Sequence, residues 1–243
     1  MIGKQDTSEI TLDPAHFDAY ACSYDAALQL GISLTGESRE YYAERRLHWL
    51  RRYLDGEGRR PHHVLDYGCG TGMGTALSRS ILGAHHVTGV DVSRGLLAAA
   101  QRTFKGGVSF RQLLELPETP TFDVAISNGV FHHIPPASRP EAARYVLRRL
   151  RRGGIFALWE NNPWNPGTLA VMRRIPFDRD AQTLSPLEAS DLLSSVGFTI
   201  RTRAFLFYFP RALALLRPLE RFLTRVPLGG QYCIIASRES PSA

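Results

Sequence analysis

The chain is poor in lysine and in cysteine. Among its 243 residues, 29 are basic, but the only lysines are Lys4 and Lys105, so arginine carries nearly all of the positive charge behind the net +6. The cysteines Cys22, Cys69 and Cys233 are far apart and form no Cys-x-x-Cys pair, which excludes a disulfide scaffold and a cysteine zinc site. We therefore expect no bound metal and a reducing, cytoplasmic setting.

Long apolar runs are also missing. No stretch approaches the roughly 18 apolar residues of a membrane-spanning helix, and no charged and then apolar leader opens the chain. With 44% hydrophobic residues the chain can still bury a full core, and folds of this size are commonly one domain. We expect an N-terminal helical lid over 1–60, a core over 61–239 and a short tail at 240–243, in a monomer or homodimer.

Arginines cluster at Arg148, Arg149, Arg151 and Arg152, and such clusters can contact nucleic-acid phosphates. Here they end a helical pattern over 138–150, where cations offset the negative end of the helix dipole, and two glycines then stop the helix. We therefore expect no nucleic-acid partner.

Strand and helix signals alternate along the chain, which predicts an α/β fold with helices on both faces of a mostly parallel sheet. The predicted strands are 63–67, 86–90, 108–111, 122–127, 155–159, a stretch around 198–207, and 232–236. The predicted helices are 75–82, 94–103, 138–150 and 186–196.

A glycine-rich turn, DYGCGTG (66–72), follows the first strand and opens a helix, where backbone N–H groups meet nucleotide-type ligands. The dinucleotide pattern GxGxxG fails, because Met73 or Thr75 would have to be glycine. A GxGxG turn preceded by a carboxylate leaves room for an amino acid group and a ribose, and the carboxylate attracts an ammonium. S-adenosylmethionine supplies that ammonium.

Three motifs in this order resemble those of the class I S-adenosylmethionine-dependent methyltransferases, in their small-molecule branch of the type 11/12 kind. They are VLDYGCGTG (64–72), GVDVS (89–93) and FDVAISNGVFHHIP (122–135). The resemblance covers about 17–238. It implies a Rossmann-like sheet of seven strands, mostly parallel with an antiparallel last strand, and an enzyme that uses S-adenosylmethionine.

Cofactor contacts follow from this resemblance and from the chemistry of the residues. Asp91, about 20 residues past the glycines, is expected to accept hydrogen bonds from the ribose hydroxyls. The glycines permit close backbone approach, and Asp66 favours the ammonium. Where many relatives carry an acid, Gln112 can accept from the adenine amine, with a solvent-facing position as the alternative. The expected set is Tyr24, Asp66, Gly68, Cys69, Gly70, Asp91, Val92, Gln112, Leu113 and Asn128.

The stretch ENNPWNP (160–166) is similar at first sight to the Asn-Pro-Pro-aromatic motif of enzymes that methylate exocyclic amines. That motif follows the fourth strand, where this chain reads SNGV without proline, whereas ENNPWNP follows the fifth. It resembles instead the Glu-His-Asn-Pro-aromatic-Asn-Pro signature of small-molecule-type methyltransferases that also carry a Pro-Phe-Asp stretch and Pro-Leu-Gly-x-Gln-Tyr. The chain matches both, with IPFD at 175–178 and PLGGQY at 227–232.

Two Asn-Pro steps make this loop stiff, which suits a substrate-binding role; the alternative is that they only form turns. Asn161 stands where the relatives carry histidine. The expected substrate contacts are Tyr20, Glu160, Asn161, Asn162 and Trp164.

The candidate catalytic bases are His132 and His133, since imidazole accepts a proton near neutral pH; the alternative is that they only begin a helix. We expect methyl transfer to a small-molecule acceptor, through an oxygen of a natural product or glycolipid-type compound. Two other functions stay open. One is a non-methylating cyclisation or rearrangement on the same fold, and the other is RNA methylation.

The apolar stretch 204–216 (AFLFYFPRALALL) is rich in aromatics and is broken by Pro210. We expect it to pack beside the sheet and to line a lipophilic acceptor pocket, with contact to a membrane surface as the weaker alternative.

Overall fold

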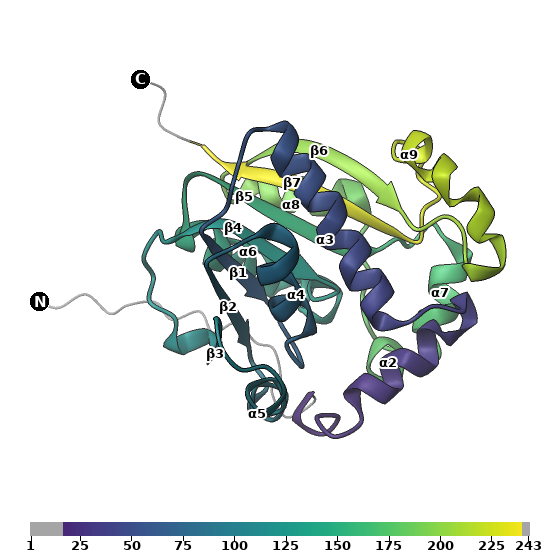
Figure 1. Cartoon of the computed structure of the whole chain (residues 1–243), viewed down its shortest axis with the longest axis horizontal. Helices are drawn as coiled ribbons and strands as arrows, with labels where there is room; N and C mark the ends of the chain where they lie inside the picture. The colour runs from purple at the N-terminus through teal and green to yellow at the C-terminus, as the bar shows by residue number, and fades with distance from the viewer. Residues whose placement is uncertain (1–16, 240–243) are drawn as a thin grey trace, which may run out of the picture.

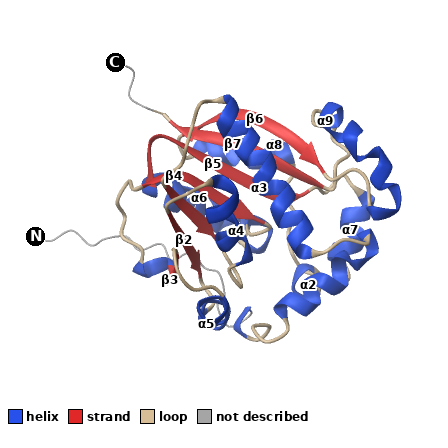
Figure 2. Ribbon diagram, in the orientation of Figure 1, coloured by secondary structure: helices blue, strands red, loops and turns tan. Residues whose placement is uncertain are grey.

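The computed structural model describes residues 17–239, in which a single sheet of seven strands has the order β3-β2-β1-β4-β5-β7-β6. Helices cover both of its faces (Figures 1 and 2). The strand β7 pairs antiparallel with β5 and β6, whereas the other pairings are parallel. The expected Rossmann-like sheet is thus confirmed. The strands are β1 (His63–Tyr67), β2 (His86–Asp91), β3 (Val108–Gln112), β4 (Phe122–Asn128), β5 (Leu150–Asn161), β6 (Phe198–Leu206) and β7 (Gln231–Arg238).

Helix starts follow local capping chemistry. Ser93 accepts a hydrogen bond from Leu96 N (3.1 Å), and Ser185 forms a capping box with Glu188. The α-helices are α2 (Tyr24–Ile32), α3 (Arg39–Gly56), α4 (Met73–Leu82), α5 (Arg94–Thr103), α6 (Arg139–Arg149), α7 (Pro166–Met172), α8 (Pro186–Ser195) and α9 (Glu220–Leu223). Short 3-10 helices include η1 (Ser33–Thr35), η2 (Leu113–Glu115), η3 (Phe131–His133), η4 (Pro136–Ser138), η5 (Pro176–Asp178) and η6 (Arg211–Leu219).

The sheet divides the core into two apolar layers. Val64 packs with α3 and α4, whereas the next residue, Leu65, packs with α6 and α8, because successive strand side chains point to opposite faces. Leu47, Leu50 and Leu54 of α3 are buried in the first layer. One face of α3, within the expected lid segment, therefore packs in the core, and the lid over 1–60 stays a prediction. The expected tail at 240–243 lies outside the described residues.

The junction of α6 and β5 differs from the expectation. The helix ends at Arg149, and β5 begins at once with Leu150, which is buried and pairs with Phe122. The two glycines therefore lie inside β5, where the positive φ of Gly153 (73°) bends the strand instead of stopping a helix.

Arginines of the cluster at this junction make contacts within the fold. The guanidinium of Arg149 lies over the ring of Tyr145 at 3.4 Å and donates to the Leu116 carbonyl (2.8 Å). Arg148 pairs with Glu118 (2.9 Å). Arg151 pairs with Asp123 (2.8 Å), so three of the four cations are engaged within the fold, which weakens the case for a phosphate-binding surface.

None of the helices within residues 17–239 has the length and apolar character needed to cross a bilayer.

Candidate active site

A cavity of about 500 Å³ opens at the carboxyl ends of β1, β4 and β5. The glycine-rich turn borders it on one side, and α2, α3, α7 and the chain after β6 border it on the other. Its size is typical of small-molecule sites, and open α/β sheets bind their ligands at this edge.

Only glycine fits the tight turns of the first loop. Gly68 has φ 74°, and a Cβ at this position would lie 2.3 Å from Val130. Gly72 has φ 84°, and a Cβ there would lie 2.7 Å from Phe110. Asp66, Gly68, Cys69 and Gly70 all line the cavity, so the backbone of this loop is open to a ligand.

Asp66 brings a buried carboxylate to the cavity. Burial raises its pKa to about 6, although the hydroxyl of Thr75 donates a hydrogen bond to it (2.7 Å) and opposes that rise. A carboxylate held away from water with so little compensation gains from a cationic ligand. This environment fits the ammonium of S-adenosylmethionine.

Asp91 lies behind the loop and does not line the cavity. Its carboxylate accepts hydrogen bonds from Gly70 N (2.8 Å) and Ser93 N (2.9 Å), and burial raises its pKa. The structure therefore gives Asp91 a positioning contact to the loop that the sequence did not suggest. The expected ribose contact remains a prediction.

Three other expected cofactor residues also lie outside the cavity. Val92 packs against the core layer of α6 and α8, and Leu113 is buried in that layer. The side chain of Gln112 caps η2 in a capping box with Glu115, so it is committed to the backbone in this arrangement. The assignment of Gln112 to adenine stays a prediction, and binding would require this side chain to leave its capping position.

Asn128 and Tyr24 do line the cavity. Asn128 is exposed at the end of β4, and the Tyr24 ring stacks on Phe177 at 4.8 Å. The helix α2 that carries Tyr24 is tied to the glycine-rich loop, because the Thr71 hydroxyl donates to Asp25 (2.8 Å). The lid is thus joined to the cofactor loop by a direct polar contact.

The residues just before α2 make a second polar contact that holds this lid against the rest of the fold. Asp18 accepts hydrogen bonds from the Ser93 hydroxyl (2.5 Å) and Gly95 N (2.9 Å), and these contacts lower its pKa. Tyr20 packs edge-on against Phe177 at 5.5 Å and does not line the cavity. Its expected substrate contact stays a prediction.

Side chains alternate between the two faces of the sheet along β5, so the first residues of ENNPWNP point in opposite directions. Trp159 and Asn161 line the cavity, whereas Glu160 between them faces the opposite side. Asn161 accepts a hydrogen bond from the Gln231 amide (3.1 Å), and Gln231 in turn accepts one from Arg46 (3.0 Å). A chain of hydrogen bonds therefore runs from Arg46 through Gln231 to Asn161 along the cavity wall.

Asn162 joins the ENNPWNP loop to the PLGGQY stretch. Its side-chain amide donates to the carbonyls of Pro227 (3.1 Å) and Gly229 (2.8 Å), and its backbone N–H donates to Gly230 (3.1 Å). Asn162 is fully buried by these contacts. The two stretches thus form one structural unit, and the expected substrate contact of Asn162 is revised to an anchoring role.

Trp164 is 46% exposed and lies outside the cavity, with its ring 6.5 Å from that of Phe205. Its position does not support the expected substrate contact.

Glu160 is buried and holds His132. Its Oε1 accepts from Val130 N (3.0 Å) and Phe131 N (2.7 Å), and its Oε2 lies 2.6 Å from Nδ1 of His132. Since a carboxylate can only accept, the Nδ1 atom donates, and this fixes the orientation of the ring. The expected substrate contact of Glu160 is revised to positioning of His132.

Asp178 lies on the other side of the histidine pair. Its Oδ1 is 3.2 Å from Nε2 of His133 and 3.6 Å from Nε2 of His132. Burial alone would raise the pKa of Asp178, but the two histidines lower it to about 2. Both imidazoles and Asp178 line the cavity, so this cluster is the main titratable group facing an acceptor.

The two histidines differ in protonation. Burial alone would lower the pKa of His132, but Glu160 and Asp178 outweigh it and raise that pKa to about 10. Burial and the neighbouring His132 lower the pKa of His133, even though Asp178 opposes them. Near neutral pH, His132 is therefore an imidazolium and His133 a neutral imidazole.

Ligand atoms of His132, His133 and Asp178 lie within 4.8 Å of one another and could hold a metal ion. The imidazolium of His132 already supplies a positive charge between Glu160 and Asp178. The expectation of no metal stays a prediction.

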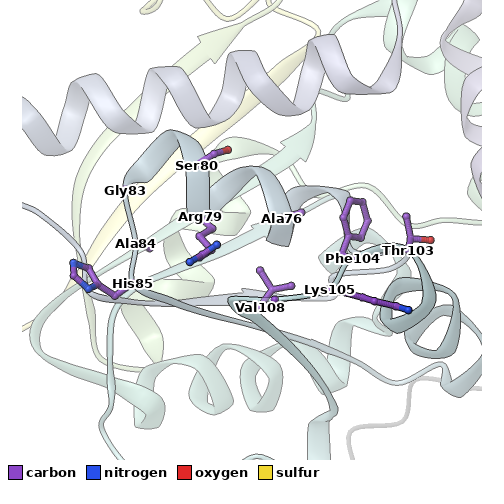
Figure 3. A pocket seen from close by; sticks show the side chains of 11 residues that line it. Ala76, Arg79, Ser80, Gly83, Ala84, His85, Thr103, Phe104, Lys105 and Val108 are labelled. Atoms are coloured by element: carbon purple, nitrogen blue, oxygen red, sulfur yellow. The ribbon is translucent and has the colours of Figure 1, made fainter.

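A second hollow, of about 580 Å³, lies at the amino ends of β2 and β3. Figure 3 shows the side chains that line it, which include Arg79, Lys105 and Phe104. It contains no carboxylate and lies at the sheet edge opposite the glycine-rich loop. We therefore place the active site in the first cavity.

Among the cavity residues outside the expected sets, Asp178, Gln231 and Arg46 carry polar or charged groups that contact other site residues. Asp178 and Gln231 belong to the IPFD and PLGGQY stretches. The resemblance therefore pointed to these stretches, but it assigned no role to either residue. Arg46 on α3 carried no signal in the sequence, since one arginine among many on an amphipathic helix is typical of a solvated face. Burial lowers the pKa of Arg46 to about 10, and the charge of Asp66 opposes that change.

The sequence of the chain is similar to those of known methyltransferases. The stretch 64–154 matches the methyltransferase domain family. A protein from Encephalitozoon cuniculi, named only as a methyltransferase, is 39% identical over 126 residues, which are 50% of this chain and 57% of that relative. The chain spans about half or less of the length of the first curated relatives it matches.

Solved structures share the fold over most of the chain. An S-adenosylmethionine-dependent methyltransferase from Mesorhizobium loti is 20% identical with a TM-score of 0.56, covering 79% of this chain and 98% of the other. Magnesium protoporphyrin IX methyltransferase from Synechocystis, solved with S-adenosylhomocysteine, is 18% identical with a TM-score of 0.53, covering 81% and 83%. At these identities the likeness shows the fold.

Proposed function

We propose that the chain, which matches the methyltransferase domain family over 64–154, is a class I S-adenosylmethionine-dependent methyltransferase, and that it transfers the methyl group to an oxygen of a lipophilic small molecule. One observation carries this proposal. The cavity joins the glycine-rich loop and Asp66 at one end to the pair His132 and His133 at the middle and to apolar walls at the other end.

Residues of the loop fit the cofactor. Asp66 would hold its ammonium, because that buried carboxylate gains from a cation. Gly68, Cys69 and Gly70 would contact it through the backbone, and Asn128 and Tyr24 would close over it. When bound, S-adenosylmethionine supplies a methyl group activated by a sulfonium centre.

His133 is the proposed base. Its lowered pKa leaves it neutral near pH 7, so it can accept the proton of an acceptor hydroxyl. Asp178 holds its ring, and His132 stays protonated between Glu160 and Asp178. Because methyl displacement depends strongly on alignment, the base contributes together with the orientation imposed by the cavity.

The apolar walls select the acceptor. Phe207, Tyr208 and Phe209 after β6 line the cavity together with Trp159 and Ile175. Beside these walls, Asn161 with Gln231 offers hydrogen bonds to one part of the molecule. A hydroxylated compound with a large apolar portion matches this lining.

Product analysis tests the proposal. The purified protein is incubated with S-adenosylmethionine carrying a labelled methyl group and with lipid-soluble, hydroxylated acceptors, and both S-adenosylhomocysteine and labelled product are measured. Gly68→Ala serves as the control, because its Cβ would collide with Val130 and distort the cofactor loop. An altered acceptor with unchanged S-adenosylmethionine would contradict methyl transfer and support the non-methylating alternative.

A further inference from the structure

A ridge of exposed apolar side chains stands next to the cavity. It lies on η6, α9 and the turn that follows, over 211–228. Of the eleven large apolar side chains that are exposed within residues 17–239, six belong to this segment. We call this surface the leucine ridge; its members are Leu213, Leu215, Leu216, Leu219, Phe222 and Leu228.

The segment that carries the ridge, including α9, lies at one end of the molecule, near α7 and away from β3 (Figure 1). Leu215 is 95% exposed and Phe222 is 69% exposed, so neither contributes to the core. Clustered apolar side chains of this kind mark a binding surface, whereas single ones are ordinary. The ridge is therefore a candidate docking surface.

The charges around the ridge are of one sign. Between 207 and 228 the chain has four arginines and a single acid, Glu220. Glu220 turns inward, where it accepts hydrogen bonds from Tyr208 N (3.0 Å) and Phe209 N (3.1 Å). Arg217 pairs with Glu37 (2.6 Å). The exposed charges left on the segment are thus positive.

Those exposed cations are Arg211, Arg221 and Arg225. An apolar ridge with a positive fringe complements an anionic lipid surface, in which apolar side chains enter the bilayer boundary while arginines meet lipid phosphates. A second copy of this chain fits less well. In a two-fold contact the same surface meets itself, so the three arginines would approach their own copies.

The same segment leads directly into the cavity. Phe207 to Pro210, immediately before the ridge, line its wall, and so does Leu34, which is 48% exposed. Phe207 has φ 65°, the one positive φ of a non-glycine residue within 17–239, and the chain leaves the sheet there. A molecule seated in a bilayer under the ridge would therefore meet an apolar path into the cavity.

We propose that the leucine ridge docks on the surface of an anionic lipid bilayer, and that the acceptor is a hydroxylated molecule whose apolar chain is anchored in that bilayer. The identity of the acceptor rests on the proposed methyl transfer, whereas the docking does not. The protein lies on the membrane in this arrangement, with the mouth of the cavity toward the lipid.

Vesicle co-sedimentation tests the docking. The wild-type chain is mixed with vesicles of phosphatidylcholine alone or with added phosphatidylglycerol, and bound protein is measured at low and high salt. Binding should require phosphatidylglycerol and weaken with salt. Leu215→Glu should lower binding by about tenfold or more, since it removes a leucine from the apolar contact and adds a like charge to the anionic surface.

A matched control separates this surface from general effects of charge. Leu114 on η2 is also 95% exposed and lies outside the ridge, so Leu114→Glu should bind vesicles like wild type. Replacing both Arg221 and Arg225 with glutamate should remove the salt-sensitive part of binding. Circular dichroism and melting temperature check that each variant is folded.

Three results would overturn the docking: no wild-type binding to anionic vesicles, equal losses in Leu114→Glu and Leu215→Glu, or a dimer that Leu215→Glu dissociates without any vesicle binding. Turnover separates the two proposals. With a water-miscible acceptor, Leu215→Glu should consume S-adenosylmethionine at the wild-type rate, because the ridge is outside the cavity. If vesicles bind but no variant or wild type makes S-adenosylhomocysteine, methyl transfer fails and the docking stands.

Discussion

Replacing Asp66 with asparagine should stabilise the fold at neutral pH while weakening the binding of S-adenosylmethionine. Burial raises the pKa of this carboxyl from 3.8 to about 6, so the folded chain holds the proton more tightly than the unfolded chain. A raised carboxyl pKa stabilises the fold at low pH, and this contribution is lost as pH rises. Asparagine keeps an acceptor for Thr75 and carries no charge to desolvate.

The magnitude follows from proton linkage. The pKa of the carboxyl is about 6 in the folded chain and 3.8 in the unfolded chain. The free energy of unfolding of wild type should therefore fall by about 2 kcal/mol relative to that of Asp66→Asn between pH 4.5 and 7.5. Urea denaturation of both proteins at these two pH values measures it. Asp191→Asn, at an exposed acid of α8, controls for a general change in charge.

Two results would refute the reasoning. An equal stability difference between wild type and Asp66→Asn at both pH values would show that the buried carboxylate is not destabilised. Unchanged affinity for S-adenosylmethionine by calorimetry would remove Asp66 from the cofactor site.

The remaining predictions concern the loop, the acceptor end and the histidines. Asp91→Ala should weaken cofactor binding and also lower the free energy of unfolding by roughly 2 kcal/mol or more, because two buried N–H groups lose their acceptor; unaltered denaturation curves would contradict this. Asn161→Ala should raise KM for the acceptor about fivefold with cofactor affinity unchanged, whereas Trp164→Ala should change neither; an effect of Trp164→Ala on KM would return that residue to the site. Glu160→Gln should lower the pKa of His132 from about 10, as NMR titration would show. The raised pKa of His132 stabilises the fold fully below pH 6.5, and this stabilisation is lost as pH rises to about 10. The stability deficit of Glu160→Gln should therefore narrow between about pH 6.5 and 10, and a deficit constant with pH would argue against the ion pair. Dialysis against EDTA should leave turnover unchanged, because a proton on His132 already balances the carboxylates, and loss of activity restored by a divalent ion would reverse this view.

The glycine-rich loop beside the cavity could be predicted because it is local in sequence, whereas Asp91, Val92, Gln112 and Leu113 of the expected cofactor set lie outside the cavity. The glycines of the first loop need positive φ whatever surrounds them, and Asp66 precedes them on the same strand. The acceptor end was predicted less well. Glu160 and Asn161 are adjacent, yet only Asn161 enters the cavity, because the pairing of β5 with β7 decides which face each residue takes.

The sequence by itself determined the order of strands and helices, the cofactor loop and the cofactor class, because apolar periodicity, caps and glycine turns act within a few residues. Tertiary structure alone decided that Glu160, His132 and Asp178, from three separate segments, form one charged cluster. Their protonation depends on burial and on distances across the fold, which no local pattern carries. The leucine ridge is likewise a tertiary result. The stretch 204–216 was expected to pack beside the sheet and line a pocket, and only the fold shows that Leu213, Leu215 and Leu216 are exposed.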